Sequence, residues 1–140
     1  MLINLLLLIG ALGALYLILI MPKLGRNPEA KKMEGWLYAH RGVHSNKKGP
    51  PENSIPAFLK AIEKGYGIEL DVQLTKDGIP VVFHDYDLQR ACGVDLKVAH
   101  LTYGELRRYR LFNSSEMIPS LAEVLAVVNG RVPLIIELKI

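Results

Sequence analysis

The pattern of apolar and polar residues divides the chain into two parts. Residues 2–21 are almost wholly apolar, and Asn4 is the one strongly polar side chain among them. A helix rises about 1.5 Å per residue, so about 20 such residues cover the hydrocarbon core of a bilayer. A cleaved signal sequence would carry basic residues before a shorter apolar core and a small-residue cleavage site, and neither is evident. We therefore expect a transmembrane helix over residues 1–22.

A basic linker is expected over residues 23–35. Four cationic side chains follow the apolar segment, and no Lys or Arg precedes it; they are Lys23, Arg26, Lys31 and Lys32. Positively charged flanks tend to stay in the cytoplasm, so this asymmetry predicts a single-pass membrane protein whose remaining residues are cytoplasmic. The linker could hold the domain near anionic head groups or act as a plain solvated tether.

Beyond the linker, apolar runs of strand length alternate with runs of helix length. Residues 36–40 are predicted to form a short strand. A helix is expected over residues 55–62, because either Asn53 or Ser54 can cap its first turn. A second strand, over residues 68–74, follows that helix. This order of elements predicts a βαβ unit.

The later part of the chain adds two strands and two helices. A turn at residues 75–78, with Asp-Gly at its tip, returns the chain into a strand over residues 80–84. Helices are expected over residues 101–109 and 119–128, because each begins with a capping box. Residues 133–136 are uniformly apolar and lead into Glu137-Leu138-Lys139, which predicts a buried strand over residues 133–139.

Polar side chains gather where these strands end. Glu69 and Asp71 share one face of their strand, because side chains two residues apart point to the same side. Two buried carboxylates need a partner charge, and oxygen ligands favour Mg²⁺ or Ca²⁺ over thiophilic metals. Alternatively, one carboxylate faces solvent and the other caps a turn. Because His40, Arg41 and His84 end neighbouring strands, the cluster indicates a catalytic site.

Six short motifs, in their order and spacing, resemble the glycerophosphodiester phosphodiesterase family. They are His40-Arg41-Gly42, Pro51-Glu52-Asn53-Ser54, Glu69-Leu70-Asp71-Val72, Thr75-Lys76-Asp77-Gly78, His84-Asp85 and Glu137-Leu138-Lys139. The resemblance spans residues 36–140 and implies an α/β fold of the TIM (β/α)8 barrel type. It also implies metal-dependent hydrolysis of glycerophosphodiesters to glycerol 3-phosphate and an alcohol.

The resemblance implies a role for each matching position. These are the metal ligands Glu69, Asp71 and Glu137, the acid/base pair His40 and His84, the phosphate contact Arg41, and Glu52, Asn53 and Lys139, which support or contact the substrate. Phosphodiester cleavage needs positive charge near the non-bridging oxygens and proton transfer at the attacking and leaving oxygens. A metal with two cationic side chains supplies the first, and two histidines supply the second. His44 and His100 are expected to lie outside the site, and the sequence does not decide which catalytic histidine is the acid.

The length conflicts with a complete barrel, which takes about 250 residues. The four predicted strands are half of the eight required, so we expect the first half of a barrel, as a fragment or truncated product. Three hypotheses stay open: a phosphodiesterase for glycerophosphodiesters, a lysophospholipase D-like enzyme acting on lipids, and a non-catalytic half-barrel. The presence of every acid/base and metal position argues against decay, whereas a missing half argues against activity.

Composition narrows the possible partners. The net charge is only +3, and the excess lies in the linker and at Lys47 and Lys48. No aromatic stripe or nucleic-acid motif accompanies it, so no nucleic-acid partner is expected. With Cys92 as the only cysteine, the chain can form no intrachain disulfide and no thiolate zinc site.

Overall fold

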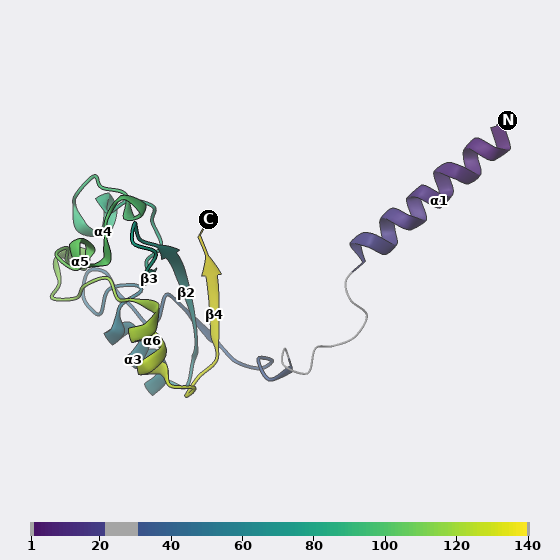
Figure 1. Cartoon of the computed structure of the whole chain (residues 1–140). Coiled ribbons are helices and arrows are strands. Elements are labelled where there is room, and N and C mark those ends of the chain that lie inside the picture. Colours follow the sequence, from purple (N-terminus) through teal and green to yellow (C-terminus); the bar gives the residue numbers. More distant parts are fainter. Residues whose placement is uncertain (1, 22–30, 140) are drawn as a thin grey trace. The chain divides into compact units, whose positions relative to one another are not determined.

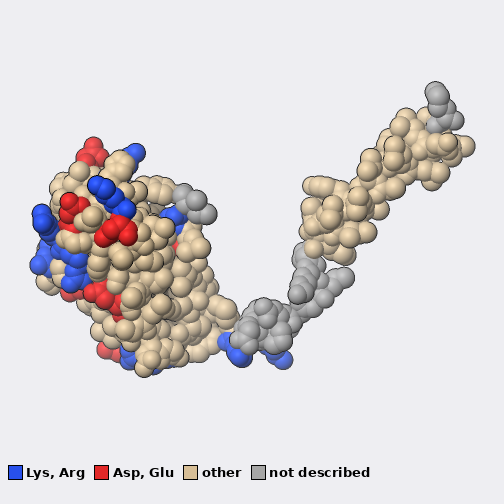
Figure 2. Space-filling view, in the orientation of Figure 1, with Lys and Arg blue, Asp and Glu red and all other residues tan. Residues whose placement is uncertain are grey.

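The computed structural model describes residues 2–21 and 31–139, and the chain forms two units, Met1–Glu34 and Gly35–Ile140 (Figure 1). The first unit contains the apolar helix α1, Leu2–Ile20. Figure 2 shows no charged side chain on this helix. The helix is long and apolar enough to cross a membrane, a property that signal sequences share. Lys23 and Arg26, which the predicted linker depends on, lie outside the described residues.

The second unit is built on one sheet of four strands. These are β1 (Tyr38–His40), β2 (Gly67–Leu74), β3 (Pro80–Val82) and β4 (Leu134–Leu138). The central strand β2 pairs in parallel with β1 and β4, which lie along opposite edges of β2, and pairs antiparallel with β3. In Figure 1, β2 and β4 run side by side in the same direction. The helix between β1 and β2 completes the predicted βαβ unit, which is confirmed.

One of the four predicted strands is not a barrel strand, because β3 runs against the parallel direction. The amide nitrogens of Arg41 and Phe83 bond to the carbonyl oxygens of Glu69 and Asp71, each at 2.9 Å. Carbonyls of alternate residues point to the same edge of a strand, so β1 and β3 share one edge of β2 in succession. The described residues therefore contain three parallel strands, and the count of four barrel strands is wrong. The hairpin instead returns the chain to the level of Asp71.

Short helices connect the strands. They are α3 (Ile55–Glu63), α4 (Gln89–Cys92), η1 (Val98–His100), α5 (Tyr103–Leu106), η2 (Leu111–Asn113) and α6 (Leu121–Val128). Ser54 caps α3, and both predicted capping boxes form, at the starts of α5 and α6. The helix expected over residues 101–109 is shorter than predicted and ends at Leu106.

Two apolar clusters stabilise the second unit. In the first, α3 and α6 contribute Phe58 and Val124, which pack with Ile68 and Leu70 of β2. The second cluster lies under the hairpin; it consists of Val81, Phe83, Leu88, Ala91, Val98, Leu106, Leu111 and Ile118. Because strand side chains alternate, Ile68, Leu70 and Val72 of β2 are used for the core. The odd-numbered residues are left for the opposite face of the sheet.

Strand β4 was expected to be buried, and in the described residues it is not. Ile135, Ile136 and Leu138 are 41%, 39% and 68% exposed. The strand pairs with β2 along one edge, and no described strand pairs with its other edge. An apolar run indicates that a strand is suited to burial, whereas the exposure of the strand depends on which neighbours are present.

Candidate active site at the ends of the parallel strands

The strand register brings four of the predicted site residues to one face of the sheet. His40 on β1 is the partner of Glu69 on β2, and Asp71 on β2 is the partner of Glu137 on β4. Partners in a parallel ladder point to the same side. All four side chains therefore lie on the face opposite the α3 and α6 core, close to the carboxyl ends of the strands.

Three of the carboxylates form a compact acidic cluster. Glu69, Asp71 and Glu137 each offer one oxygen within 4.8 Å of the others. Asp71 is 1% exposed, and its Oδ2 accepts a hydrogen bond from Nδ2 of Asn53 at 3.0 Å. Its Oδ1 accepts no hydrogen bond from any described residue, although Nζ of Lys139 lies 3.5 Å away. A buried carboxylate oxygen without a donor, next to two further carboxylates, fits a hard divalent cation.

The HRG motif forms a left-handed turn after β1. Arg41 and Gly42 have φ angles of 55° and 82°. The turn aims the amide of Arg41 at Oε2 of Glu69, at 3.2 Å. Nε of Arg41 lies 3.1 Å from Oδ2 of Asp71, and Nη1 donates to Oε1 of Glu52 at 3.0 Å. The backbone turn thus places one guanidinium between two carboxylates.

Replacing Gly42 with alanine is expected to destabilise the protein by about 3 kcal/mol, from left-handed backbone strain plus overpacking. An added Cβ would lie 2.8 Å from the carbonyl carbon of Ala57. Gly65 is the matched control, because its φ is also positive, at 68°, and nothing lies within 4 Å of an added Cβ. Thermal unfolding should show a clearly larger loss for Gly42→Ala than for Gly65→Ala. Equal losses would mean that the contact with Ala57 is harmless.

His84 is held by its neighbour in the sequence and by a buried amide. Its Nδ1 lies 2.6 Å from Oδ1 of Asp85. Nε2 of Gln73 donates to the carbonyl oxygens of Phe83 and Asp85, both at 2.8 Å, and so fixes the backbone on either side of the histidine. Burial raises the pKa of Asp85, but hydrogen bonds from Arg90 and His84 outweigh it and leave the pKa below its ordinary value. The carboxylate is ionised and can only accept, so Nδ1 of His84 carries the proton.

His40 has a more open setting. Its side chain is 68% exposed, and its Nε2 lies 3.9 Å from Oε2 of Glu69. Lys139, just after β4, has its Nζ 2.6 Å from Oε1 of Glu137. That hydrogen bond, together with the charge of Asp71, raises the pKa of Lys139. The two residues therefore flank the acidic cluster, His40 from the β1 side and Lys139 from the β4 side.

Glu52 is the hub of an ionic network beside the acidic cluster. The side chain is 7% exposed and accepts hydrogen bonds from Nδ2 of Asn46 at 2.7 Å, from Arg41 and from Arg90. Burial raises its pKa, but the hydrogen bonds from Arg90 and Asn46 and the charges of both arginines lower it to about 2. Both carboxylate oxygens accept hydrogen bonds from protein groups, so Glu52 holds neighbouring side chains in place.

The stability that Glu52 contributes is expected to disappear in acid. Its pKa falls from 4.5 to about 2 on folding. A lowered carboxyl pKa stabilises the folded state above the unfolded-state value, and this stabilisation is lost as the pH falls through the folded-state value. The melting temperature of the protein should therefore exceed that of Glu52→Gln near neutral pH, and the gap should close between pH 4.5 and 2. The exposed Glu63→Gln is the control, and a pH-independent gap would contradict the assignment.

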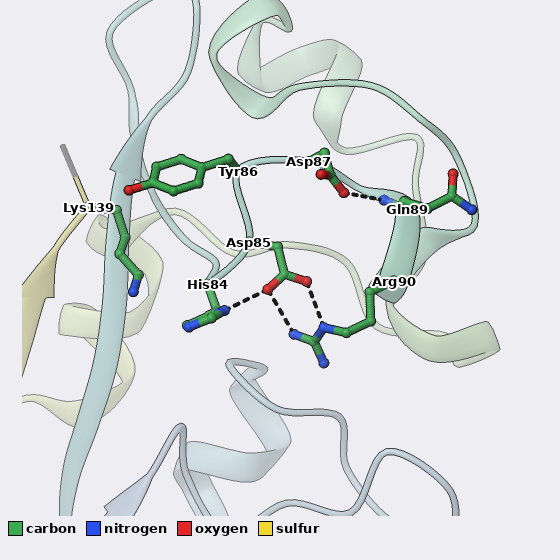
Figure 3. A pocket seen from close by; sticks show the side chains of 7 residues that line it. All are labelled: His84, Asp85, Tyr86, Asp87, Gln89, Arg90 and Lys139. Atoms are coloured by element: carbon green, nitrogen blue, oxygen red, sulfur yellow. Dashed lines mark hydrogen bonds and ion pairs between the residues drawn. The ribbon is translucent and has the colours of Figure 1, made fainter.

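A cavity of about 460 Å³ adjoins His84, Arg90 and Lys139. It is lined by His84, Asp85, Tyr86, Asp87, Gln89, Arg90 and Lys139 (Figure 3). The other two histidines lie elsewhere: Nδ1 of His44 is 3.1 Å from the carbonyl oxygen of Gly42, and His100 is exposed at the end of η1.

Sequence reasoning missed part of the network. Asn46 and Gln73 belong to no motif, and the sequence distinguishes Asp85 only as part of the His-Asp pair. Arg90 lies 38 residues from Glu52, its partner, so no local spacing could have connected them. A cation five residues after Asp85 was the one available signal.

The fold and the site together define a class of protein. Parallel strands joined by helices, with acidic and basic residues at the strand carboxyl ends, are the arrangement of a partial TIM barrel. A model of the glycerophosphoryl diester phosphodiesterase family matches residues 40–140, and the chain belongs to this family.

Curated relatives agree with this assignment. The chain is 40% identical over 111 residues to a glycerophosphodiester phosphodiesterase of Bacillus altitudinis, covering 74% of the chain and 44% of that protein. It is 36% identical over 97 residues to human glycerophosphodiester phosphodiesterase 1, covering 63% of the chain and 28% of that protein. The chain thus spans less than half the length of these relatives.

Solved structures have the same fold. A glycerophosphodiester phosphodiesterase from Thermotoga maritima matches with a TM-score of 0.64 at 39% identity, over 75% of the chain and 44% of that structure. An Oleispira antarctica phosphodiesterase in complex with the product sn-glycerol-3-phosphate matches with a TM-score of 0.68 at 31% identity, over 79% of the chain and 47% of that structure.

Proposed function

We propose that the protein hydrolyses glycerophosphodiesters to glycerol 3-phosphate and an alcohol with the help of a divalent metal. The observation that carries the proposal is the acidic cluster at the strand ends, with His40, Arg41 and Lys139 beside it and His84 on the cavity that Lys139 also lines, in a chain of this family. Residues 36–140 are proposed as its catalytic part. The product complex of the Oleispira antarctica relative supports a glycerol phosphate ester as substrate.

The charge balance of the site supports a divalent cation. The ion pairs and the acidic cluster together contain five carboxylates and three cationic side chains. The carboxylates are those of Glu52, Glu69, Asp71, Asp85 and Glu137, and the cations are Arg41, Arg90 and Lys139. One divalent ion would balance the excess. We propose Glu69, Asp71 and Glu137 as its ligands, and both Mg²⁺ and Ca²⁺ suit their oxygens. The bound metal would offset negative charge on the phosphate.

The remaining roles follow from what each side chain touches. Arg41 and Lys139 supply positive charge beside the acidic cluster, where a phosphate would sit. His84 holds Nδ1 against Asp85, so Nε2 is the atom that exchanges a proton with the substrate. His40, exposed at the end of β1, is the second acid or base. Asn53 orients Asp71 through its side-chain amide.

A second candidate function is a lysophospholipase D-like reaction on lipids. An apolar groove of about 510 Å³ adjoins the site and shares Tyr86 and Lys139 with the site cavity. Leu74 and Leu138 line this groove and are largely exposed. An acyl chain could lie along such a surface, and an anchored enzyme would meet lipids in the bilayer.

Turnover by the full chain in detergent micelles tests both candidates. Glycerophosphocholine and lysophosphatidylcholine are compared, each with Mg²⁺ and with Ca²⁺. Release of glycerol 3-phosphate from the first supports the main proposal. Faster formation of lysophosphatidate from the second would favour the lipid reaction. Metal binding without turnover of either would support a non-catalytic half-barrel.

We further propose that residues 1–22 span a membrane, with 23–35 as a basic linker and the catalytic part in the cytoplasm. The support is the length and apolarity of α1 and the cations that follow it. The protein is expected to stay in the membrane fraction through alkaline carbonate washing, with its N-terminus intact. Recovery in the soluble fraction, or a new N-terminus just after the apolar segment, would contradict the anchor.

A further inference from the structure

Arg90, a residue of the helix α4, lies between the carboxylates of Asp85 and Glu52. Its Nε donates to Oδ2 of Asp85 at 2.7 Å and its Nη2 to Oδ1 at 3.2 Å. Its Nη2 also donates to Oε1 of Glu52 at 2.6 Å, and its Nη1 to Oε2 at 3.2 Å. One guanidinium therefore forms a two-point contact with each carboxylate, and Figure 3 shows the half that faces Asp85.

Each of these carboxylates in turn holds a residue of the proposed reaction. Oδ1 of Asp85 lies 2.6 Å from Nδ1 of His84. Oε1 of Glu52 accepts from Nη1 of Arg41 at 3.0 Å. A continuous path of hydrogen bonds thus runs from His84 through Arg90 to Arg41, joining the loop after β3 to the turn after β1.

We propose that Arg90 is a positioning residue that fixes His84 and Arg41 relative to each other. This inference rests on the proposed function, which assigns proton transfer to His84 and phosphate contact to Arg41. Arg90 acts through Asp85 and Glu52, since all but one of its N–H donors are used by these two carboxylates.

Physical chemistry favours arginine at this position over lysine. A planar guanidinium can bond two carboxylates with two contacts each, whereas an ammonium group is a point charge with fewer fixed directions. The Arg90 guanidinium also lies 5.3 Å from the centroid of the Phe112 ring, which holds its plane in place. Without Arg90, Asp85 and Glu52 would lose the cation between them and would repel each other. This repulsion would move the two carboxylates, and with them the side chains of His84 and Arg41.

The first test is the tautomer of His84, read by long-range ¹H–¹⁵N spectra of the full chain in detergent micelles, at a pH where imidazoles are neutral. In the unaltered protein the proton of His84 should reside on Nδ1. Arg90→Lys and Arg90→Gln should both give a mixture of tautomers, while the signals of His100 stay unchanged. An unchanged His84 tautomer in Arg90→Lys would overturn the proposal. Because Arg90→Lys keeps the positive charge, it still gives a result if Arg90→Gln fails to fold.

Arg107 provides the matched control. Its Nη1 lies 3.0 Å from Oε1 of Glu123, and its guanidinium lies 5.8 Å from the centroid of the Tyr103 ring, far along the chain from the site residues. Arg107→Gln therefore removes the same kinds of contact. The His84 tautomer should be unaffected by it, and an equal effect of both substitutions would overturn the specific role of Arg90.

Kinetics separate positioning from direct substrate contact. Arg90→Lys should lower kcat by about 10- to 100-fold, the range for groups that orient other site residues, with little change in KM. A raised KM with unchanged kcat would overturn the proposal in favour of direct binding. If the unaltered chain has no turnover, the proposed function fails, and the tautomer comparison alone decides the role of Arg90.

Discussion

Asp71→Asn is expected to weaken Mg²⁺ or Ca²⁺ binding by about 100-fold or more and to abolish most turnover. Groups that only orient a ligand are worth about 10- to 100-fold in metal affinity, so a direct ligand should reach at least the upper end. Asp71 is the buried member of the acidic cluster and has an oxygen without a hydrogen-bond donor among the described residues. Isothermal titration calorimetry of the full chain in micelles measures the binding.

Two further variants make this result specific. Asp71→Asn also removes a charge next to Arg41, so a loss of binding could reflect local misfolding. Glu137→Gln avoids this problem, because its side chain is 54% exposed and still belongs to the acidic cluster. It should weaken metal binding as well, whereas the exposed Glu63→Gln should not. Metal affinity unchanged in both Asp71→Asn and Glu137→Gln would refute the ligand assignment.

His40→Ala and His84→Ala should each lower kcat by about 10² to 10⁴, the range for one positioned acid or base. The double variant should lose less than the product of the two single losses, because residues that act together in one step are not additive. His84 should show the effect even with metal bound, since it is not one of the proposed metal ligands and its Nδ1 lies against Asp85. Release of glycerol 3-phosphate under saturating substrate measures kcat.

The remaining histidines serve as controls for this prediction. His44 contacts a backbone carbonyl and His100 lies exposed on η1. Alanine at either position should leave kcat within about twofold, because neither histidine has a role in the proposed reaction. A loss at His44 or His100 as large as at His40 would mean that the acid/base pair has been assigned to the wrong residues.

The sequence predicted features that depend on neighbouring residues. Ser120 and Glu123 are three residues apart, so a helix start brings them together wherever the helix lies, and the capping box forms. Glu69 and Asp71 are two residues apart on a strand and so share a face in any fold. The apolar helix α1 likewise needs only its own composition to be recognised.

Features that depend on distant partners were missed or predicted incorrectly. The Asp-Gly turn indicated that the chain reverses, but not that β3 would lie along the same edge of β2 as β1. The apolar run in β4 predicted burial, yet the described residues cover only one edge of that strand.

The sequence by itself determined the identity of the chemical groups: which residues are acids, bases and cations, and at which strand ends they arise. The tertiary structure decided which of these groups lie next to one another and form ion pairs or clusters. The register of β4 brings Glu137 opposite Asp71, and the fold of α4 brings Arg90 to Glu52, 38 residues earlier. Hydrogen bonds and ion pairs act over a few ångströms, whatever the separation along the chain, so only the packed fold sets these contacts.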